Sequence, residues 1–587
     1  MTAAPRSPVT GAGEPGRVAV IAPDGSLTFA ELEARVVALH RRLAAHGAGP
    51  DQIIGVRLPR SLDLVVALLS VWRAGAAYLP IDPDLPPQRQ RFMLRDSAAA
   101  LLISTTGGEP TGPPVLAVDA PTPPADGTQL TPAVVPAGTL AYVLYTSGST
   151  GQPKAVAVTR AGVANLMQGL ADLGVYASGT RTVAWNASAS FDASVQQWTR
   201  LLRGDSIVLL GAERTDPEAL AALLRQHAVT DLDITPTHWA TVRDAVVAGR
   251  TGRPDPLRIL IGGEPIPGAM WTDLSQLVDH GVVEAINVYG PTETTVDATA
   301  ARIRSGTPHI GHPLTGVHAY VLDEHLQPVP LGATGELFLA GAGLARGYLN
   351  RPGLTARSFL PDVLVGDGSR MYRTGDLVRR RSDGSMEFLE RRDRQIKLRG
   401  LRVEPGEIEA ALAADNMVRD VRVLLRDDLP GGAGLVAYCV VENPGPQAAD
   451  RLRRSATDQL PAALRPGAIV TLAAFPRTSN GKLDTGALPP PVRAYQGLCP
   501  GRPESLKDRV LTAAAGALGL DHVAADDDFF ALGGNSLHAA SIRARLRGAL
   551  GLRVPPRLLF DHPRLGDFAA QVCVLADTAT SPRQEER

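Results

Sequence analysis

Hydrophobic and polar residues follow two different rhythms along the first part of the chain. Over residues 29–43 the apolar side chains recur at helical spacing, which predicts an amphipathic helix. Residues 53–58 form a short apolar run typical of a strand, and residues 62–72 are typical of a buried helix. Alternating helix and strand patterns of this kind predict an α/β fold with buried sheets.

Regions rich in proline and glycine separate the patterned segments. Residues 106–136 predict a loop with at most one short strand. Residues 489–503 include three consecutive prolines and have the composition of a linker. A short helical region follows over residues 504–575, and the polar residues 576–587 predict a disordered tail.

The charged residues balance almost completely. The chain has 59 Lys and Arg against 60 Asp and Glu, a net charge of −1, which argues against a protein built to bind nucleic acid. Apolar residues make up 44% and charged residues 20%, as in ordinary globular proteins. The three cysteines, Cys439, Cys499 and Cys573, form neither a disulfide framework nor a CxxC metal site.

The sequence contains no stretch that combines the length and the apolarity of a membrane span. The most apolar segment, residues 62–78, is interrupted by Arg73 and is too short. Residues 1–17 lack the apolar core of a signal peptide. We therefore expect a cytoplasmic protein without a membrane or nucleic-acid partner.

A loop of small residues carries the first candidate chemistry. A strand pattern at residues 140–145 runs into the string TSGSTGQPK, residues 146–154, and a second apolar stretch follows. Small residues let backbone N–H and hydroxyl groups surround phosphate oxygens, and Lys154 adds a positive charge. The loop is not a Walker A motif, because the GK[ST] ending is absent and a strand pattern follows it. For a bare loop of this composition, a hairpin turn is the alternative.

The string YTSGSTGQPK resembles the phosphate loop of the adenylate-forming enzymes, and in particular of nonribosomal peptide synthetase adenylation domains. Further motifs of that family follow in the family's order over about residues 20–490. They are LTFAEL (27–32), AGAAYLPID (74–82), FDAS (191–194), NVYGPTETT (287–295), GEL (335–337), GAGLARGY (341–348), YRTGDL (372–377), QIKLRG (395–400) and NGK (480–482). Taken singly, most of these motifs have plainer interpretations, such as a turn or a helix cap. The ordered set favours the family.

The resemblance implies a large adenylate-forming N-terminal domain, residues 1–392, and a small, mobile α+β C-terminal subdomain, residues 393–488. Asp393 would be the hinge about which the small domain turns. The small domain would present Lys482 for adenylation and then the loop around Gly400 for thioester formation. The arginine-rich residues 379–402 also contain acids and few aromatic residues, so a solvated face is a better interpretation than a nucleic-acid patch.

The resemblance further implies a ligase that uses ATP and Mg²⁺ to activate a carboxylate. Tyr289 would stack on adenine, and Asp376 would bind the ribose with help from Arg391. Glu293 would ligate Mg²⁺, and Lys482 would bridge the substrate carboxylate and the α-phosphate. The expected catalytic set is Lys482, Thr292 and Glu293, with Thr292 on the α-phosphate. The expected nucleotide-binding set is Thr146, Ser147, Gly148, Ser149, Thr150, Gly151, Lys154, Gly263, Glu264, Pro265, Asn287, Tyr289, Gly290, Asp376, Arg391 and Lys482.

The family's pocket positions indicate the substrate. Apart from Lys482, they are Asp192, Ala193, Gln196, Asp233, Leu260, Gly262, Val288, Val296 and Asp297. Asp192 would pair with an α-ammonium group, which makes the substrate an α-amino acid. Asp233 and Asp297 would repel a side-chain carboxylate, whereas a neutral amide can donate to an Asp and accept from Gln196. This set is similar to the family's glutamine-type pockets, and the glutamate-type set has Lys in place of Gln196. The sequence therefore predicts L-glutamine.

The string DFFALGGNSLH, residues 528–538, precedes a helical run at residues 541–550 and resembles a peptidyl carrier domain. We expect this domain, a small all-α helical bundle, over residues 504–575. Ser536 would carry a covalent 4′-phosphopantetheine arm added by a phosphopantetheinyl transferase, whereas a simple helix start is the alternative. Asn535 stands where the family often has His or Asp.

The chain lacks an HHxxxD condensation motif and a GxSxG thioesterase elbow. We therefore expect it to pass its loaded amino acid to a condensation or tailoring enzyme in trans, in a pathway such as antibiotic biosynthesis. An MbtH-like protein is a candidate activator. The departures from the family pattern are Ala155 for Gly, Arg160 for His and Glu390 for Gly. The rival functions are an acyl- or aryl-CoA ligase and a degenerate adenylation domain that serves as a carrier scaffold.

Overall fold

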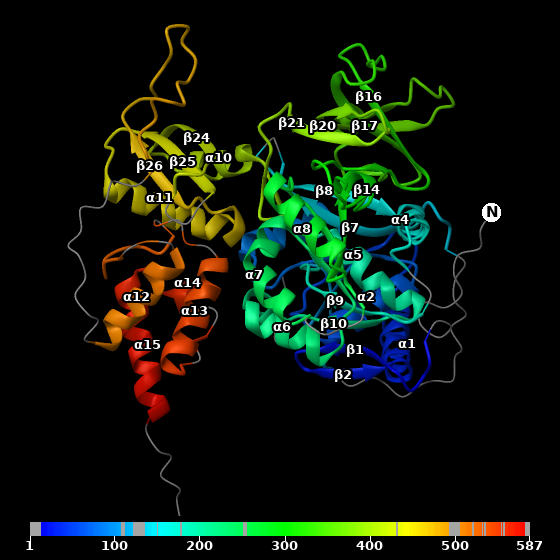
Figure 1. Ribbon diagram of the computed structural model, residues 1–587, viewed down its shortest axis with the longest axis horizontal. Helices are drawn as coiled ribbons and strands as arrows, with labels where there is room; N and C mark the ends of the chain where they lie inside the picture. Colours follow the sequence, from blue (N-terminus) through cyan, green and yellow to red (C-terminus); the bar gives the residue numbers. More distant parts are fainter. Residues whose placement is uncertain are drawn as a thin grey trace, which may run out of the picture. The chain divides into compact units, whose positions relative to one another are not determined.

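The structure is a computed structural model (Figure 1). It describes residues 13–106, 112–120, 135–148, 151–176, 179–250, 255–429, 433–491, 505–518, 520, 522–530, 532, 534, 536–552, 554–555 and 558–580. The chain divides into two compact units, of which the first comprises Met1–Ser147 and Pro153–Arg402. The second comprises Gly148–Gln152 and Val403–Arg587.

The first unit contains a large sheet with the strand order β15-β14-β13-β12-β11-β9-β10-β1-β2. Its central strands β10, β9, β11, β12 and β13 run parallel, and β2, β14 and β15 are antiparallel to their neighbours. The strand bounds are β1 Val18–Ala22, β2 Gly25–Thr28, β9 Thr182–Trp185, β10 Ser206–Leu209, β11 Asp231–Ile234, β12 Leu257–Gly262, β13 Val283–Tyr289, β14 Thr299–Arg302 and β15 His312–Pro313.

A second sheet of the first unit has the order β18-β8-β7-β4-β3-β5-β6. Its strands are β3 Ile53–Val56, β4 Ala77–Pro80, β5 Leu101–Ser104, β6 Val115–Ala117, β7 Leu140–Thr146, β8 Lys154–Thr159 and β18 Gly347–Tyr348. One continuous hydrophobic core joins this sheet to the large one. It contains Ile54 and Tyr142 from the second sheet, Ile207 and Ile286 from the large sheet, and Trp198 between them. Both sheets are therefore buried, as the alternating pattern predicts.

A smaller sheet has the order β16-β17-β20-β19, with β21 paired to β20. Its strands are β16 Val317–Leu322, β17 Thr334–Gly341, β19 Phe359–Pro361, β20 Arg370–Arg380 and β21 Met386–Arg391. In Figure 1 the labels β16, β17 and β20 mark this sheet, in green. A two-stranded hairpin, β22 Ile396–Leu398 and β23 Leu401–Val403, follows it in the chain.

Helices cover the sheets of the first unit. Their bounds are α1 Phe29–Ala45, α2 Leu62–Arg73, α3 Pro87–Asp96, α4 Arg160–Asp172, α5 Ala193–Trp198, α6 Pro217–Gln226, α7 Pro236–Ala248, α8 Gly268–Asp279 and α9 Pro352–Ser358. Short 3₁₀ turns occupy Thr199–Arg203, Ala212–Thr215 and Thr292–Thr294. A capping box explains the start of α1, because the side chains of Thr28 and Glu31 each accept from the other's backbone N–H. The LTFAEL motif thus has a structural role at this helix start.

The second unit contains the sheet β24-β25-β26, which packs with α10 and α11. These elements span β24 Val418–Arg426, β25 Gly434–Val441, β26 Ala468–Leu472, α10 Pro405–Ala413 and α11 Pro446–Gln459, with a 3₁₀ turn at Ala462–Leu464. A helical bundle follows, made of α12 Leu506–Leu518, α13 Ser536–Leu550, α14 Leu558–Asp561 and α15 Leu565–Thr580. The bundle has its own apolar core around Phe529, Ile542 and Phe568.

These elements confirm the predicted α/β class and the helices and strands expected in the first part of the chain. The compact units divide at Arg402–Val403, so Asp393 lies within the first unit, and its role as the hinge stays a prediction. One expected boundary differs from the structure. Helix α15 continues to Thr580, so residues 576–580 are helical where the sequence predicts a disordered tail.

Candidate active site

The residues expected to bind the amino acid lie where parallel strands of the large sheet end. Asp233 lies in β11, Leu260 and Gly262 lie in β12, and Val288 lies in β13. Because β11, β12 and β13 are parallel neighbours, their carboxyl ends meet at one edge. In open α/β sheets, this edge is where ligands usually bind.

Asp192 is the N-cap of α5, where its side chain accepts a hydrogen bond from the Ala193 N–H at 2.9 Å. The Thr292 hydroxyl donates to Asp192 Oδ2 at 2.5 Å. Burial raises the pKa of Asp192, while the hydrogen bond from Thr292 opposes that rise. The structure therefore joins a residue expected on the amino acid to one expected on the α-phosphate.

Two glutamines on α5 converge on the buried Asp233. Gln196 Nε2 donates to Asp233 Oδ2 at 3.0 Å, and Gln197 Nε2 donates to the same oxygen at 3.1 Å. Gln197 also accepts from the Ala187 N–H at 3.1 Å through its Oε1 atom, which fixes its amide. Burial raises the pKa of Asp233 to about 6 in spite of these hydrogen bonds.

Two buried acceptors of this pocket have no hydrogen-bond partner among the described residues. They are Gln196 Oε1 and Asp297 Oδ2. Burial, together with the nearby Asp233 and Asp192 carboxyls, raises the pKa of Asp297 well above its usual range. A buried polar atom without a partner costs about 1–3 kcal/mol, so both atoms are left able to pair with polar atoms of a ligand.

Glu293 lies at the centre of a cluster of cations and hydroxyls, and its side chain is fully buried. Lys154 Nζ is 3.2 Å from Glu293 Oε1, and the Tyr348 hydroxyl donates to the same oxygen at 2.7 Å. Arg402 Nη1 bridges both oxygens, at 3.0 Å from Oε1 and 2.8 Å from Oε2. Burial alone would raise the pKa of Glu293, but Arg402 and Lys154 outweigh it and lower that pKa. Glu293 is therefore held as a carboxylate, the donor that Mg²⁺ prefers.

A second polar chain joins the residues expected around the adenosine. The Tyr289 hydroxyl donates to Asp376 Oδ2, and Arg391 Nη1 donates to Asp376 Oδ1 at 2.6 Å. Arg391 also forms a two-point ion pair with Asp393, at 2.7 Å for each contact. Lys397 Nζ lies 5.0 Å from the centroid of the Tyr289 ring, a cation–π contact.

The turn expected beside the base contacts the loop around Gly400. The Gly400 N–H donates to Glu264 Oε1 at 2.6 Å, and Thr237 donates to Glu264 Oε2 through both its N–H and its hydroxyl. Gly263 has φ +84°, a conformation that favours glycine. Asn287, also expected at the base, donates its amide to the His309 carbonyl at 2.7 Å.

The phosphate loop is only partly described. Ser147 Oγ donates to the Arg402 carbonyl at 2.7 Å, and Thr146 Oγ1 is a buried acceptor and donor without a partner among the described residues. In the second unit, the Gly148 N–H donates to Glu407 at 3.3 Å, and Gly151 has φ +86°. Ser149 and Thr150 lie outside the described residues. The strand β8 follows this loop, as expected for a loop that is not a Walker A motif.

The departures from the family pattern at residues 155 and 160 have structural explanations. Ala155 lies in β8 opposite Tyr145 and is buried in a hydrophobic cluster that takes its methyl group. Arg160 stacks on Trp72 at 4.2 Å and donates to the Trp72 carbonyl at 2.6 Å. Nothing in the structure explains Glu390.

Two expected residues lie in the second unit. Lys482 is exposed in a tight turn, where its carbonyl accepts from the Thr478 N–H at 2.8 Å and Gly481 has φ +77°. Ser536 is the first residue of α13. The structure does not describe the Ser536 side chain, so its role as an attachment site remains a prediction.

Several contacts of this site were not predicted from the sequence. Gln197, Tyr348, Lys397 and Arg402 all touch predicted site residues. Tyr348 and Lys397 lie within quoted motifs, and Gln197 follows directly on Gln196. The spacing of a motif does not show which of its side chains points into a site, so these contacts could be identified only from the structure.

Gly290 holds the backbone that positions Thr292 and Glu293. A Cβ atom at Gly290 would lie 2.1 Å from the Val296 carbonyl oxygen and 2.8 Å from the Ala298 nitrogen. Neither backbone atom can yield without moving the 292–297 turn, in which Val296 has φ +67°.

We therefore expect Gly290→Ala to lower the free energy of unfolding by about 1–3 kcal/mol and to weaken nucleotide binding. Urea unfolding of the purified chain measures the first effect. Gly353→Ala is the matched control, because Gly353 lies in α9 with nothing within 4 Å of its added Cβ. Equal stability of the two variants would contradict the packing argument.

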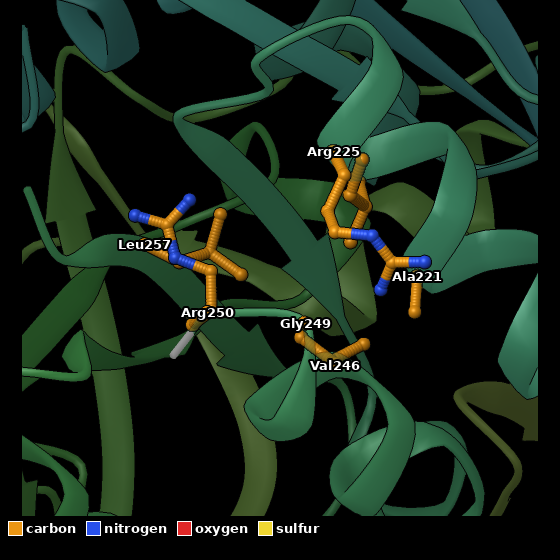
Figure 2. Close-up of a pocket in the computed structure, with 7 residues that line it drawn as sticks. Ala221, Arg225, Val246, Gly249, Arg250 and Leu257 are labelled. Carbon is orange, nitrogen blue, oxygen red and sulfur yellow. The ribbon is translucent and has the colours of Figure 1, made fainter. Parts of the chain in front are cut away.

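A small pocket lies elsewhere in the first unit, between α6, α7 and the start of β12 (Figure 2). Its volume is about 10 Å³, room for about one water molecule. It is lined by Ala221, Leu224, Arg225, Val246, Gly249, Arg250 and Leu257. None of these belongs to the predicted site, so this pocket is not the substrate pocket.

Comparison with known families decides the class of the protein. Residues 9–349 match the family described as AMP-binding enzyme. The chain belongs to this family. Residues 407–482 match the AMP-binding enzyme C-terminal domain, and residues 508–572 match the phosphopantetheine attachment site. The chain therefore combines an ATP-using, adenylate-forming ligase with a phosphopantetheine carrier domain, and this confirms the predicted class, fold and cofactors.

The relatives are nonribosomal peptide synthetases. Phosphinothricin tripeptide synthetase PhsB of Streptomyces viridochromogenes is 41% identical, over 98% of this chain and 49% of its own length. A dimodular nonribosomal peptide synthase of Bacillus subtilis is 36% identical, over 98% of this chain and 24% of its own length. The chain thus spans about half or less of these two curated relatives.

A solved structure has the same domain content. It is holo-PA1221, a nonribosomal peptide synthetase protein with adenylation and PCP domains, bound to a vinylsulfonamide inhibitor. It is 28% identical, covers 96% of each chain and has a TM-score of 0.77. Within the residues that the structure describes, no helix of this AMP-binding enzyme has the length and apolarity needed to cross a membrane.

Proposed function

We propose that this AMP-binding enzyme activates L-glutamine with ATP and transfers the glutaminyl group to its own carrier domain. The observation that supports glutamine is the pair of buried, unpartnered acceptors, Gln196 Oε1 and Asp297 Oδ2, in the pocket that also holds Asp192. Asp192 would pair with the α-ammonium group, and the two acceptors would face the side-chain amide.

The raised pKa values of the pocket acids favour a neutral side chain. Burial and the acidic neighbours raise the pKa of Asp297 well above its usual range, which favours its protonated form as a donor to the carbonyl of an amide. Gln196 Oε1 then accepts from the amide NH₂. A glutamate side chain would bring a carboxylate next to buried acids whose pKa values are already raised, and an ornithine side chain would require Asp297 to ionise. Glutamine satisfies Gln196 Oε1 and Asp297 without requiring Asp297 to ionise.

The reaction has two steps with different demands. In the first, a carboxylate oxygen of glutamine attacks the α-phosphorus, the bond to the β-phosphate oxygen breaks, and pyrophosphate leaves. Lys482 would stabilise the negative charge that develops between the two groups. In the second, Ser536 would hold the phosphopantetheine arm, whose thiol would supply the acceptor: the acyl carbon would exchange its bond to the AMP oxygen for a bond to sulfur, and AMP would leave.

The remaining residues would hold the nucleotide. Asp376 would accept from the ribose hydroxyls, Tyr289 would contact the base, and Lys154 would bind the departing phosphates. When bound, Mg²⁺ supplies charge neutralisation of the phosphates, and Glu293 is the carboxylate that fits it. A phosphopantetheinyl transferase would install the arm, and a condensation or tailoring enzyme would accept the cargo. An MbtH-like activator belongs to the same proposal.

The specificity is tested by ATP–pyrophosphate exchange with each proteinogenic amino acid and ornithine. We expect glutamine to exceed glutamate by at least about 100-fold, because a buried site built for an amide rejects an uncompensated charge. Exchange that is stronger with glutamate or ornithine would refute the assignment. No exchange with any amino acid, combined with phosphate-loop binding of ATP, would favour the scaffold alternative. Transfer to free CoA without the carrier would favour a CoA ligase.

A further inference from the structure

The hairpin β22–β23 places cations on two residues that the proposed function assigns to the nucleotide. Lys397, in β22, lies 5.0 Å from the ring centroid of Tyr289. Arg402, in β23, contacts both oxygens of Glu293, at 2.8 and 3.0 Å. Between them, Gly400 donates to Glu264 beside the expected base. One short segment thus contacts three residues of the expected ATP site.

The contact of Arg402 conflicts with a metal at Glu293. The side chain of Glu293 is fully buried, and its oxygens already receive Arg402, Lys154 and Tyr348. A magnesium ion needs an oxygen at about 2.0–2.1 Å in near-octahedral geometry, which the guanidinium between the two oxygens prevents. Even if both fitted, two like charges about 4 Å apart would repel each other by about 4 kcal/mol per unit charge in a partly buried site.

We propose that Arg402 is a reversible substitute for Mg²⁺ at Glu293. This inference rests on the proposed function in taking Glu293 as the metal ligand. Arg402 leaves the carboxylate when Mg²⁺–ATP binds and returns once pyrophosphate and its metal have left. Glu293 is then paired with a cation in each state, which matters because a buried carboxylate without a partner costs about 3–5 kcal/mol.

The position of Arg402 in the chain allows this exchange to report on the reaction. Arg402 ends the first compact unit, and it follows Asp393, the expected hinge, by nine residues. A rotation about the expected hinge at Asp393 would withdraw the hairpin and its arginine together from the part of the first unit against which they pack. Arg402 would thus stabilise the hairpin in the position where it contacts Glu293, and only when no metal is bound to Glu293. It is a positioning residue that couples metal release to the thioester-forming step.

The test measures how tightly the full chain binds α,β-methylene-ATP, an analogue that cannot release pyrophosphate. Calorimetry measures the binding at a series of free Mg²⁺ concentrations. If Arg402 occupies Glu293 in about four molecules in five, it raises the apparent dissociation constant about fivefold. We therefore expect Arg402→Gln to lower the half-saturating Mg²⁺ concentration about fivefold. Arg402→Lys, which keeps the charge but offers a single donor point, should lower it by about twofold.

Arg394→Gln is the matched control, since Arg394 is an exposed arginine of the same segment. It should leave the half-saturating concentration unchanged. An unchanged or higher value in Arg402→Gln would overturn the inference, and Arg402→Lys decides the matter if circular dichroism shows that Arg402→Gln is unfolded. Glu293→Gln separates the two proposals. The proposed function requires that Mg²⁺ strengthens binding of the analogue to the wild-type chain and that Glu293→Gln removes this effect. If the wild-type chain shows no Mg²⁺ dependence, or if Glu293→Gln keeps it, the metal assignment of the proposed function fails as well.

Discussion

Lys482→Ala is expected to reduce glutamine-dependent ATP–pyrophosphate exchange by about 100- to 1,000-fold. A positive charge that meets the charge developing between a carboxylate and the α-phosphate contributes about 2.7–4 kcal/mol when it is aimed only at the transition state. Exposure of Lys482 in its turn implies that the ammonium group is not needed for folding. The loss should therefore appear in kcat, with the unfolding transition unchanged.

The basic residues of this chain provide a sharp control for that experiment. The 59 basic residues include only four lysines: Lys154, Lys397, Lys482 and Lys507. Lys507 is exposed on α12 of the carrier bundle, so Lys507→Ala removes the same group from a position outside the proposed site. It should exchange like the wild type.

A second arm separates the two half-reactions. Lys482→Ala supplied with synthetic glutaminyl-AMP should still load its carrier, because the second step needs no charge at the α-phosphate. Ser536→Ala should show the reverse: normal exchange, no gain of mass after treatment with a phosphopantetheinyl transferase and CoA, and no loading. Equal loss of both half-reactions in Lys482→Ala would refute the assignment of this lysine to adenylation alone.

The fold class and part of the candidate site could be predicted from the sequence. Three of the four lysines fall within the ordered motifs, and the structure brings two other motif residues, Asp192 and Thr292, into contact. The alternating patterns predicted an α/β fold with buried sheets, and the structure adds that β11, β12 and β13 are parallel neighbours. The class of fold therefore follows from local pattern, and general rules of α/β sheets then place candidate site residues at one edge.

The contacts made across the fold could not be predicted in the same way. Arg402 and Glu293 are 109 positions apart, and nothing in either motif specifies that their side chains meet. Gln197 differs from Gln196 by one position on a short helix, yet both side chains are buried and both donate to Asp233. Burial also changes the chemistry of the acids: the sequence supplies Asp297, but only its surroundings raise its pKa.

Gln196→Lys is expected to reverse the preference of the pocket from glutamine to glutamate. The Gln196 amide nitrogen lies 3.0 Å from Asp233 Oδ2, so an ammonium group in its place would pair with Asp233 and hold that acid ionised. The γ-carboxylate of glutamate would then meet a cation and the O–H of protonated Asp297. Glutamine would lose the acceptor Gln196 Oε1 and leave its NH₂ unpaired.

Each of these changes is worth about 2 kcal/mol, so the ratio of kcat/KM for glutamine to that for glutamate should change by about 1,000-fold. Exchange kinetics with both amino acids measure this ratio. Gln196→Met separates charge from shape, because it removes the amide without adding a cation: it should lose activity toward glutamine and gain none toward glutamate. A rise in glutamate activity in Gln196→Met equal to that in Gln196→Lys would show that pocket volume, and not charge, selects the substrate.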